Sequence, residues 1–539
     1  MVWSNGGTTH RSTVMGRRGM VAAAHPLASL AGIRVLASGG NAVDAAVATM
    51  AALNVVEPYM SGLGGGGAML LHRANGETIM LDYSGHAPEE IDASKLDAQS
   101  ADVGPKSITT PSALAGWVAA LERYGSMSLA DLVAPAIEYA EQGVPLTVKN
   151  AMFYGSADNR LQGPARDTFF ASGSPKAGQI VRQPTLAETY RRLAKSGADA
   201  LYQGEIGKRL VAAIQAAGGV MTERDLASVK VDWRAPSVST YRGYELRTTS
   251  WPMTSYEMQL TLNVLEGFDL GASGHNTTQT IHTIAEAMKL SVADRIAYAG
   301  AHEPPPAGLL SRSYAEARRK LIDPASAAPV EGDRFTRPRP AGSVLPGNPG
   351  DFTRECTTHL DVIDQEGNAV SITQSIGAIF GSGFMAGDTG IMMNNFLYFL
   401  DFDLDSPNAV RSNGPMLGPL SPTMLFDNGR LFLSIGTPGG FAITQTTVQM
   451  ISNVIDHGFG VQAAIEAPRF KTVAGNQLVI EDRVPVATLD ELRSLGHEVM
   501  PVDGWSAAVG GGQGILIDPE TGAYSGGADP RRDGYAMGW

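Results

Sequence analysis

Hydrophobic positions recur at helical spacing through the first 300 residues of the chain, with few strand-like runs between them. Near the N-terminus this spacing predicts helices over 26–38 and 42–53, followed by a strand over 68–72. Gly39-Gly40-Asn41 separates these two helices, as expected for a helix end and a new N-cap. Later residues predict one strand over 244–249 and helices over 112–124, 128–142, 183–196, 206–217, 257–266 and 277–298.

The pattern changes after a long connector. Residues 323–355 are rich in Pro, Gly, Ala and charged residues and show little periodicity, which is typical of a mobile, exposed segment. Beyond it, short alternating runs predict strands over 358–362 and 369–374 around a turn at 365–368. The remainder mixes helices over 444–456 and 461–467 with predicted strands over 423–426, 430–435, 478–480 and 514–517.

Composition narrows the classes of function. The 539 residues include 41 Lys and Arg against 54 Asp and Glu, a net charge of −13, so a nucleic-acid partner is not expected. The single cysteine, Cys356, excludes an intrachain disulfide and a cysteine metal cluster. The ten histidines are scattered without an HExxH motif, so we predict no metal site and no cofactor.

The first twenty residues are polar and contain Arg11, Arg17 and Arg18, without the apolar core of a secretory signal. No window of about 18 uncharged apolar residues predicts a membrane span. We therefore expect a cytoplasmic protein with no membrane partner.

The connector ends at Thr357, just before the first strand of the C-terminal part. If the bond preceding Thr357 breaks, this residue carries a free α-amine beside its own hydroxyl, and the amine can act as the base that activates the oxygen. An unperturbed α-amine has a pKa of about 8, so a useful neutral fraction exists near pH 7. The alternative is that Thr357 only begins a β-hairpin, where threonine is favoured.

Three further features bear on chemistry. Gly439 and Gly440 follow a predicted strand and precede a helix, where their N–H groups can face a developing oxyanion. Ser375 lies on the strand expected to pair with that of Thr357 and can orient its hydroxyl. An ordinary loop and a plain strand serine are the alternatives. The glycine-rich run 61–67 lacks the Lys-Ser/Thr of a phosphate loop, which leaves a phosphate-binding enzyme as a distant alternative.

Many motifs, in order along nearly the whole chain, resemble the γ-glutamyltransferase family. Near the N-terminus these are GMVAA, HPLAS, GGNAVDAAVA, LNVVEP and SGLGGGG. TTHLDVID and EGNAVSIT, which begin at Thr357, are similar to the family's processing site and hairpin. FGSGFMAGDTGIMMNN, LSPTM, GTPGG, APRF and ADPR follow in the family's order.

This resemblance implies an α+β fold, a four-layer αββα sandwich of the N-terminal-nucleophile hydrolase type. It implies that Thr357 attacks the carbonyl of Cys356 and so cuts the chain into 1–356, which ends in the mobile connector of about 323–356, and 357–539. The two subunits then form a heterodimer, which can itself pair. It further implies that Gly439 and Gly440 form the oxyanion hole and that Ser375 replaces a threonine that bonds the nucleophile.

The departures from the family pattern lie in the substrate pocket. Ser84 stands where members acting on γ-glutamyl groups have an arginine that binds the α-carboxylate in bidentate fashion, which serine cannot do. Family asparagine, glutamine, aspartate and serine positions are occupied by Gly377, Phe396, Phe399 and Gly418. Losing these polar partners disfavours a zwitterionic glutamyl group.

We therefore predict a small-molecule amide substrate that carries a carboxylate and resembles oxamate, rather than glutathione. The chain is similar to the branch with oxamate amidohydrolases and cephalosporin acylases. His86 and Arg411 are the candidates for holding the carboxylate, and solvated surface residues are the alternative reading of both. The competing functions are a true γ-glutamyltransferase or glutathione hydrolase, and a catalytically degenerate binding protein.

Overall fold

The computed structural model describes residues 9–298, 300–328 and 355–539. Most of the connector expected over 323–356 lies outside these residues. Within 323–328, every residue except Ala327 is exposed, as expected of such a connector. Ala327 is buried and its N–H donates to the carbonyl of Leu495 over 2.7 Å, while Glu355 already belongs to a strand. Backbone hydrogen bonding to neighbouring segments therefore orders both ends.

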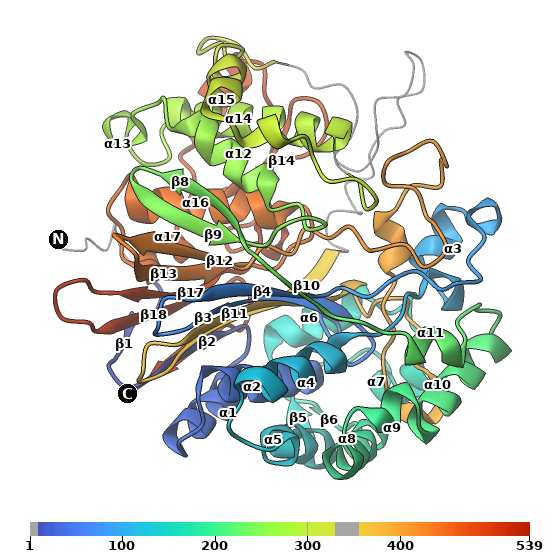
Figure 1. The fold of residues 1–539 in the computed structure, drawn as a ribbon. Coiled ribbons are helices and arrows are strands. Elements are labelled where there is room, and N and C mark those ends of the chain that lie inside the picture. The colour runs from blue at the N-terminus through green and yellow to red at the C-terminus, as the bar shows by residue number, and fades with distance from the viewer. Residues whose placement is uncertain (1–8, 299, 329–354) are drawn as a thin grey trace.

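Two seven-stranded antiparallel sheets lie face to face at the centre of the molecule (Figure 1). In spatial order the first sheet contains β1 (Val14–Gly16), β18 (Tyr524–Ala528), β17 (Gln513–Ile517), β13 (Arg430–Gly436), β12 (Thr423–Asp427), β9 (Tyr244–Thr248) and β8 (Ser237–Tyr241). The second contains β19 (Tyr535–Gly538), β2 (Met20–Ala23), β10 (Glu355–Ile363), β11 (Ala369–Ala378), β3 (Gly66–His72), β4 (Thr78–Tyr83) and β7 (Asp232–Arg234). Each sheet thus combines strands from before and after Thr357.

Helices cover both outer faces of the paired sheets (Figure 1). The second sheet is covered by α1 (Pro26–Ala37), α2 (Ala42–Val56), α4 (Ala113–Tyr124), α5 (Leu129–Gln142), α8 (Pro184–Ser196) and α10 (Glu205–Ala216). The first is covered by α12 (Tyr256–Leu265), α14 (Thr278–Tyr298), α16 (Ala442–Ile455) and α17 (Val461–Glu466). The predicted four-layer αββα sandwich is therefore confirmed.

Apolar side chains fill each of the three interfaces between layers. Met80 and Leu70 of the second sheet pack between the sheets against Met424 and Phe426 of the first. The helix α2 is buried along its whole length, and its many alanines allow it to lie close to the sheet. It continues three residues beyond the predicted end at 53, because Asn54 is held inside by the Ser61 hydroxyl over 2.8 Å.

The glycine-rich run before β3 permits close backbone packing. A Cβ on Gly64 would lie 2.1 Å from the carbonyl oxygen of Met392, and one on Gly65 would lie 2.0 Å from that of Ser375. Any larger residue would therefore push away the strand that carries Ser375. Close packing against this strand explains why these positions are glycine, and no phosphate ligand is needed to explain them.

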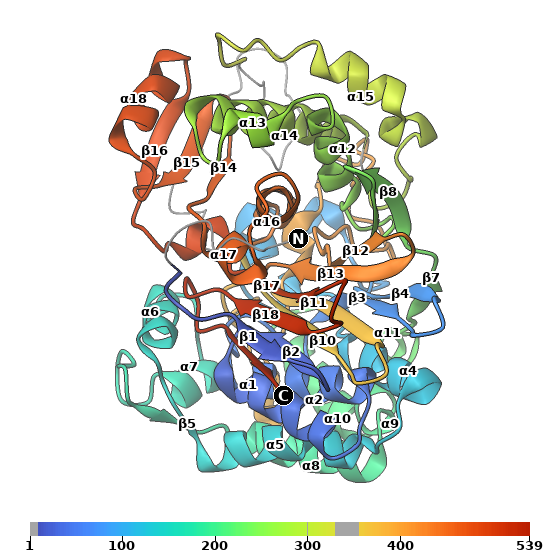
Figure 2. The same ribbon diagram turned by 90° about the vertical axis from the view of Figure 1, so that its left-hand side faces the viewer.

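A smaller three-stranded sheet forms one end of the molecule, opposite α5 and α8 (Figure 2). It contains β14 (Phe470–Thr472), β15 (Gln477–Glu481) and β16 (Glu498–Val502), with α18 (Val486–Ser494) beside it. The remaining α-helices of the described residues are α3 (Ala98–Asp102), α6 (Val148–Ser156), α7 (Pro164–Phe169), α9 (Asp199–Tyr202), α11 (Glu223–Ala227), α13 (Leu270–Ser273) and α15 (Arg312–Arg319), and β5 (Val144–Pro145) and β6 (Ile180–Val181) form a two-stranded sheet.

A fully buried ion network joins this small sheet to the C-terminal segment. Arg531 binds both carboxylate oxygens of Glu481, with Nε–Oε1 and Nη2–Oε2 distances of 2.8 and 2.6 Å. Asp529 lies 3.2 Å from Arg531 and 2.5 Å from Arg469. All four side chains have no exposed surface, so each charge depends on the others for its solvation.

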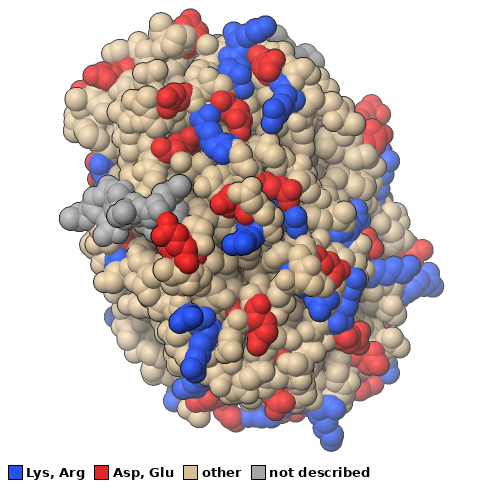
Figure 3. Space-filling view, turned by 60° about the vertical axis from the view of Figure 1, so that its left-hand side comes forward, with Lys and Arg blue, Asp and Glu red and all other residues tan. Residues whose placement is uncertain are grey.

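On the face shown in Figure 3, acidic and basic side chains are interspersed. Within the described residues, no helix combines the length and the apolar character needed to cross a bilayer.

Candidate active site

Thr357 lies in β10, buried at the centre of the second sheet, with an exposed fraction of 3%. The strand begins at Glu355 rather than at the predicted residue 358, because Cys356 pairs with Gly377 before the proposed cleavage site. The pairing with β11 shifts register between Cys356 and Thr358. The bond between Cys356 and Thr357 therefore lies at an irregularity inside a paired strand. Irregularities of this kind, such as β-bulges, often occur next to active sites.

Ser375 of β11 lies beside this bond. The hydroxyl of Thr357 is 3.4 Å from the Ser375 oxygen, and the Ser375 hydroxyl donates to the carbonyl oxygen of Cys356 over 2.6 Å. The N–H of Gly377 in turn donates to the Ser375 oxygen over 2.7 Å. The two hydroxyls expected to cooperate are thus adjacent, and one of them already polarises the carbonyl that Thr357 would attack.

The turn between β13 and α16 contains Gly439 and Gly440, with φ of +136° and +56°. Their carbonyl oxygens accept the N–H groups of Ala442 and Ile443, both over 3.0 Å, as the first bonds of the helix. Among the described residues neither glycine N–H has an acceptor, and Gly440 lines the same cavity as Thr357. The amides are therefore available to an oxyanion at a helix N-terminus.

Replacing Gly439 with Ala is expected to lower kcat about 100-fold, the usual cost of one lost oxyanion donor. The added methyl has room, since its nearest neighbours lie at 3.6 and 3.7 Å, but a φ of +136° is unsuitable for alanine. Relaxing φ rotates the peptide that carries the Gly440 N–H. Gly458→Ala is the matched control, because Gly458 also has positive φ (+67°) and open space around it. Equal steady-state kinetics of the two variants would contradict this role.

Glu57 and Arg532 flank the same strand, and the sequence interpretation missed both. The Arg532 guanidinium donates to the carbonyl oxygen of Thr357 over 3.1 Å. The hydroxyl of Thr358 donates to Glu57 over 3.1 Å, and burial raises the pKa of Glu57 to about 8. Glu57 lies within the LNVVEP motif, which is the signal that could have identified it. Arg532 directly follows the ADPR motif but is not part of it, so no motif singled it out.

The cavity at Thr357 has a volume of about 20 Å³ in the uncleaved chain. Its polar lining consists of Thr357, Ser375, Ser84 and the backbone of Gly440. The remaining walls are apolar or lack a side chain: Phe396, Phe399, Met416, Leu417, Gly418, Pro419 and Leu420. Four predicted pocket residues, namely Ser84, Phe396, Phe399 and Gly418, thus meet around the candidate nucleophile.

Gly377 is not among the residues that line this cavity. Its φ is +97°, and a Cβ there would lie 2.0 Å from the side-chain oxygen of Asn395. Asn395 accepts the N–H of Ala378 over 2.8 Å and so occupies the space that a side chain at 377 would need. The local backbone and Asn395 therefore leave no room for a side chain at position 377, where the family has an asparagine.

His86 and Arg411 lie apart from the nucleophile. His86 lines a second, larger cavity beyond Ser84, and its Nδ1 is 3.0 Å from the Thr110 hydroxyl. Burial lowers the pKa of His86, so the ring is neutral near pH 7. Arg411 is exposed and lines neither cavity. The structure thus gives neither residue a charged contact with the pocket at Thr357.

Tertiary packing also joins two histidines that are distant in sequence. His282 Nδ1 and His497 Nε2 lie 2.9 Å apart, while His282 Nε2 is 2.8 Å from the carbonyl oxygen of Asp323. The nearby carboxylate of Glu286 binds the Lys289 ammonium over 2.6 Å. Most of these polar atoms serve as one another's partners, but among the described residues Nδ1 of His497 is buried without a hydrogen-bond partner.

Comparisons with known proteins identify the family and the fold. A family model described as Gamma-glutamyltranspeptidase matches residues 28–539. The glutathione hydrolase proenzyme of Bacillus subtilis (strain 168) is 35% identical, over 98% of this chain and 93% of the relative. The Acylase ACY 1 proenzyme of Pseudomonas sp. (strain SE83) is 34% identical, over 98% and 94%.

Among solved structures, the cephalosporin acylase from Bacillus halodurans superposes with a TM-score of 0.89 at 32% identity, covering 99% of this chain and 98% of that one. The match therefore includes both sheets and both helical layers. The chain belongs to the gamma-glutamyltranspeptidase family, and it is an amide hydrolase with the N-terminal-nucleophile fold.

Proposed function

We propose that the chain cuts its own bond between Cys356 and Thr357 and then uses Thr357 as an N-terminal nucleophile. The hydrogen bond from Ser375 to the Cys356 carbonyl supports the first step, because it draws electrons from the carbon that the Thr357 oxygen attacks. Attack converts the peptide into an ester on Thr357 and frees its amine, and water then releases Cys356 as a carboxylate. The relatives named proenzymes are consistent with such processing.

In the mature enzyme, the α-amine of Thr357 takes the proton from its hydroxyl as the oxygen attacks an amide carbonyl. The free N–H groups of Gly439 and Gly440 stabilise the oxyanion, and the amine product leaves with the transferred proton. Water, or an acceptor amine, then cleaves the acyl ester. Release of Cys356 also frees the Ser375 hydroxyl, which can then bond Thr357 alone.

The fragments 1–356 and 357–539 are proposed to remain together as a heterodimer. The strand β10 of the second fragment pairs with β2 of the first over residues 360–363, and β11 pairs with β3 over 369–375. Separating the fragments would expose the centre of the second sheet and the apolar layers on both sides of it. Such an interface resembles a domain core rather than a transient contact.

We propose a small carboxylate-bearing amide, such as oxamate, as the substrate rather than glutathione. The observation that carries this proposal is the lining of the cavity at Thr357. Ser84 replaces the family arginine, and its hydroxyl is already donated to Asp82 over 2.8 Å. The adjoining walls are apolar, so the ammonium of a glutamyl group would be buried without a partner.

A true γ-glutamyltransferase or glutathione hydrolase is the second candidate. The specific observation in its favour is the 35% identity to a glutathione hydrolase proenzyme over nearly the full length of both chains. The acylase relative matches almost as well, at 34% identity. Overall similarity therefore does not choose between the two, and our proposal is based on the pocket residues.

A substrate comparison tests the proposal. We expect purified, processed enzyme to hydrolyse oxamate or a glutaryl amide with a kcat/KM at least about 30-fold above that for γ-glutamyl-p-nitroanilide, because unpaired buried charges cost roughly 2 kcal/mol or more. The assay should follow amine release under identical conditions for all three substrates. Faster turnover of the γ-glutamyl compound would overturn the proposed substrate class while leaving the processing chemistry intact.

A further inference from the structure

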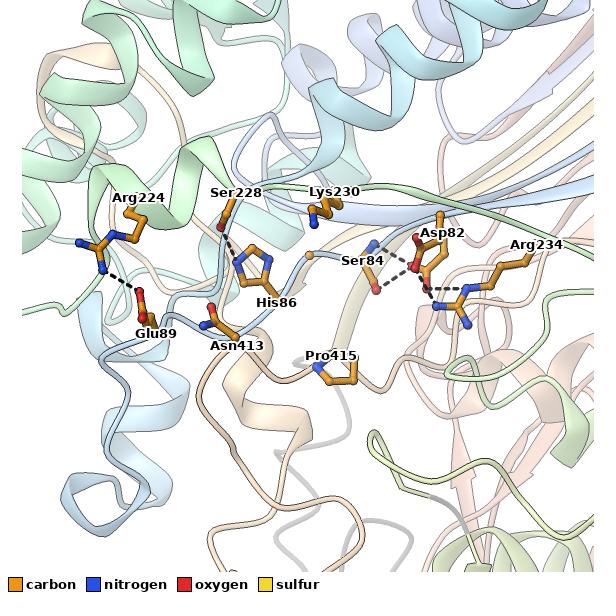
Figure 4. A pocket seen from close by; sticks show the side chains of 12 residues that line it. Asp82, Ser84, His86, Glu89, Arg224, Ser228, Lys230, Arg234, Asn413 and Pro415 are labelled. Atoms are coloured by element: carbon orange, nitrogen blue, oxygen red, sulfur yellow. Dashed lines mark hydrogen bonds and ion pairs between the residues drawn. The ribbon is translucent and has the colours of Figure 1, made fainter.

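The larger cavity of this region is lined by Ser84 but not by Thr357 and has a volume of about 440 Å³; its lining side chains are drawn in Figure 4. Three segments enclose it: the turn after β4, the stretch from α11 to β7, and the loop at 413–415. A backbone bridge between His86 and Pro415 joins the first and third of these segments. Its size is that of a small-ligand site, and Ser84 lines both this cavity and the one at Thr357.

The acidic groups of this outer cavity all have cationic partners. Glu89 pairs with Arg224 at 3.3 Å, and Asp232 pairs with Arg234 at 2.8 Å. Asp82 lies 3.9 Å from Arg234 and also accepts both the N–H and the hydroxyl of Ser84. The carboxylates therefore offer no unpaired negative charge to a ligand.

Lys230 is different from the two arginines. Among the described residues it has no ion pair, and Figure 4 shows its ammonium pointing into the cavity between His86 and Ser84. His86 adds no charge, because its pKa is lowered and its ring contacts the hydroxyls of Thr110 and Ser228 at 3.0 and 3.4 Å. Lys230 is thus the cation that remains available to a ligand.

The inner cavity cannot satisfy a distant carboxylate of the acyl group. Its walls are apolar, and the Ser84 hydroxyl at its outer end is already donated to Asp82. A carboxylate at the end of a longer acyl chain, held against these walls, would lose its hydration without gaining a donor. Because Ser84 lines both cavities, an acyl chain that extended past Ser84 would carry its carboxylate to the outer cavity, which Lys230 also lines.

We infer that Lys230 forms an anion subsite for the terminal carboxylate of an acyl chain that begins at Thr357 and passes Ser84. This inference rests on the proposed function, since it says where the carboxylate of the substrate binds. In oxamate the carboxylate is bonded directly to the amide carbon and remains at Thr357. The subsite therefore favours monoamides of longer dicarboxylic acids over oxamate itself.

The test uses the processed enzyme with oxamate, succinamate, glutaramate and adipamate, each compared with the uncharged diamide of the same length. For the chain length that wild type prefers, Lys230→Met is expected to lower the preference for the carboxylate over its diamide about five- to tenfold, mainly through KM, as expected for a partly exposed charge contact. Lys230→Arg should restore most of this preference. Arg224→Gln is the matched control, because this cation lies on the same cavity but is paired with Glu89.

The outcomes separate the subsite from the proposed function. If carboxylates are hydrolysed but Lys230→Met leaves the preference ratio unchanged at every chain length, the subsite is wrong and the proposed substrate class stands. An equal loss on carboxylates and diamides would also overturn the subsite, since it would show a structural effect. If γ-glutamyl substrates are preferred by wild type, the proposed substrate class fails first.

Discussion

Replacing Thr357 with Ala is expected to leave the chain uncut and to lower kcat/KM for any amide substrate by a factor on the order of 10⁴ or more. The substitution removes the oxygen that attacks the Cys356 carbonyl and, later, the substrate. On a denaturing gel, wild type should give bands of about 37 and 19 kDa, in proportion to chain length, and the variant one band of 56.6 kDa. Intact mass spectrometry locates the cut.

Thr357→Ser is the matched control, because it keeps the hydroxyl and removes only a methyl group. It should still be cut and should retain measurable activity. Two results would contradict the assignment: a Thr357→Ala chain that is cut at the same bond, or a fully active wild type in which residues 356 and 357 remain joined. Either would place the nucleophile elsewhere.

Replacing Arg531 with Met is expected to lower the free energy of unfolding by about 3–5 kcal/mol, measured as the shift of the denaturant midpoint. The loss removes the bidentate partner of Glu481 and a second cation from Asp529, and both carboxylates stay fully buried. Removing one partner of a buried network is costly because the remaining charges have no solvent to replace it.

Arg483→Met serves as the matched control. Arg483 also pairs with Glu481, at 2.7 Å, but 22% of its side chain is exposed, so water can replace the contact. The expected loss is about 1 kcal/mol or less. If both variants unfold at the same denaturant concentration, burial of the network is not what makes Arg531 important.

The same network predicts how stability depends on pH. Burial alone would raise the pKa values of Glu481 and Asp529, but the neighbouring arginines outweigh burial and hold both below their usual values. A carboxyl whose pKa is lower in the folded state stabilises the protein fully above its unfolded pKa of about 4. This contribution is lost as pH falls through the lower, folded value. Unfolding monitored between pH 6 and pH 3 should therefore show stability decreasing below about pH 4.

Most regular elements could be predicted from local pattern. The helix α5 begins at Leu129 and ends at Gln142, as its spacing and the preceding Ser128 indicated. The hairpin of β10 and β11 was predicted around its turn, but β10 begins three residues earlier than expected. Strand pairing at Glu355 and Cys356 depends on a partner strand, and connector-like composition gives no sign of it.

Some residues of the candidate site could be predicted from local sequence, and others could be found only from the structure. Thr357, Ser375 and the glycine pair were found because each stands in a motif with a chemical reason, and the structure places their atoms within one region. Arg532 and Lys230 were missed because nothing in their local sequence distinguishes them from surface cations. Arg532 is distinguished by the Thr357 carbonyl to which it donates, and the role proposed for Lys230 depends on the cavity that it lines.

Motifs along the chain were enough to indicate the family, the nucleophile and the loss of the arginine at Ser84, through their resemblance to the family's motifs. Only tertiary structure could show that Ser84 donates to Asp82, that burial lowers the pKa of His86 beside Thr110, and that Lys230 has no acidic partner among the described residues. The physical reason is that charge, burial and hydrogen-bond partnership belong to pairs of groups brought together from distant segments, whereas periodicity and motifs belong to a single segment.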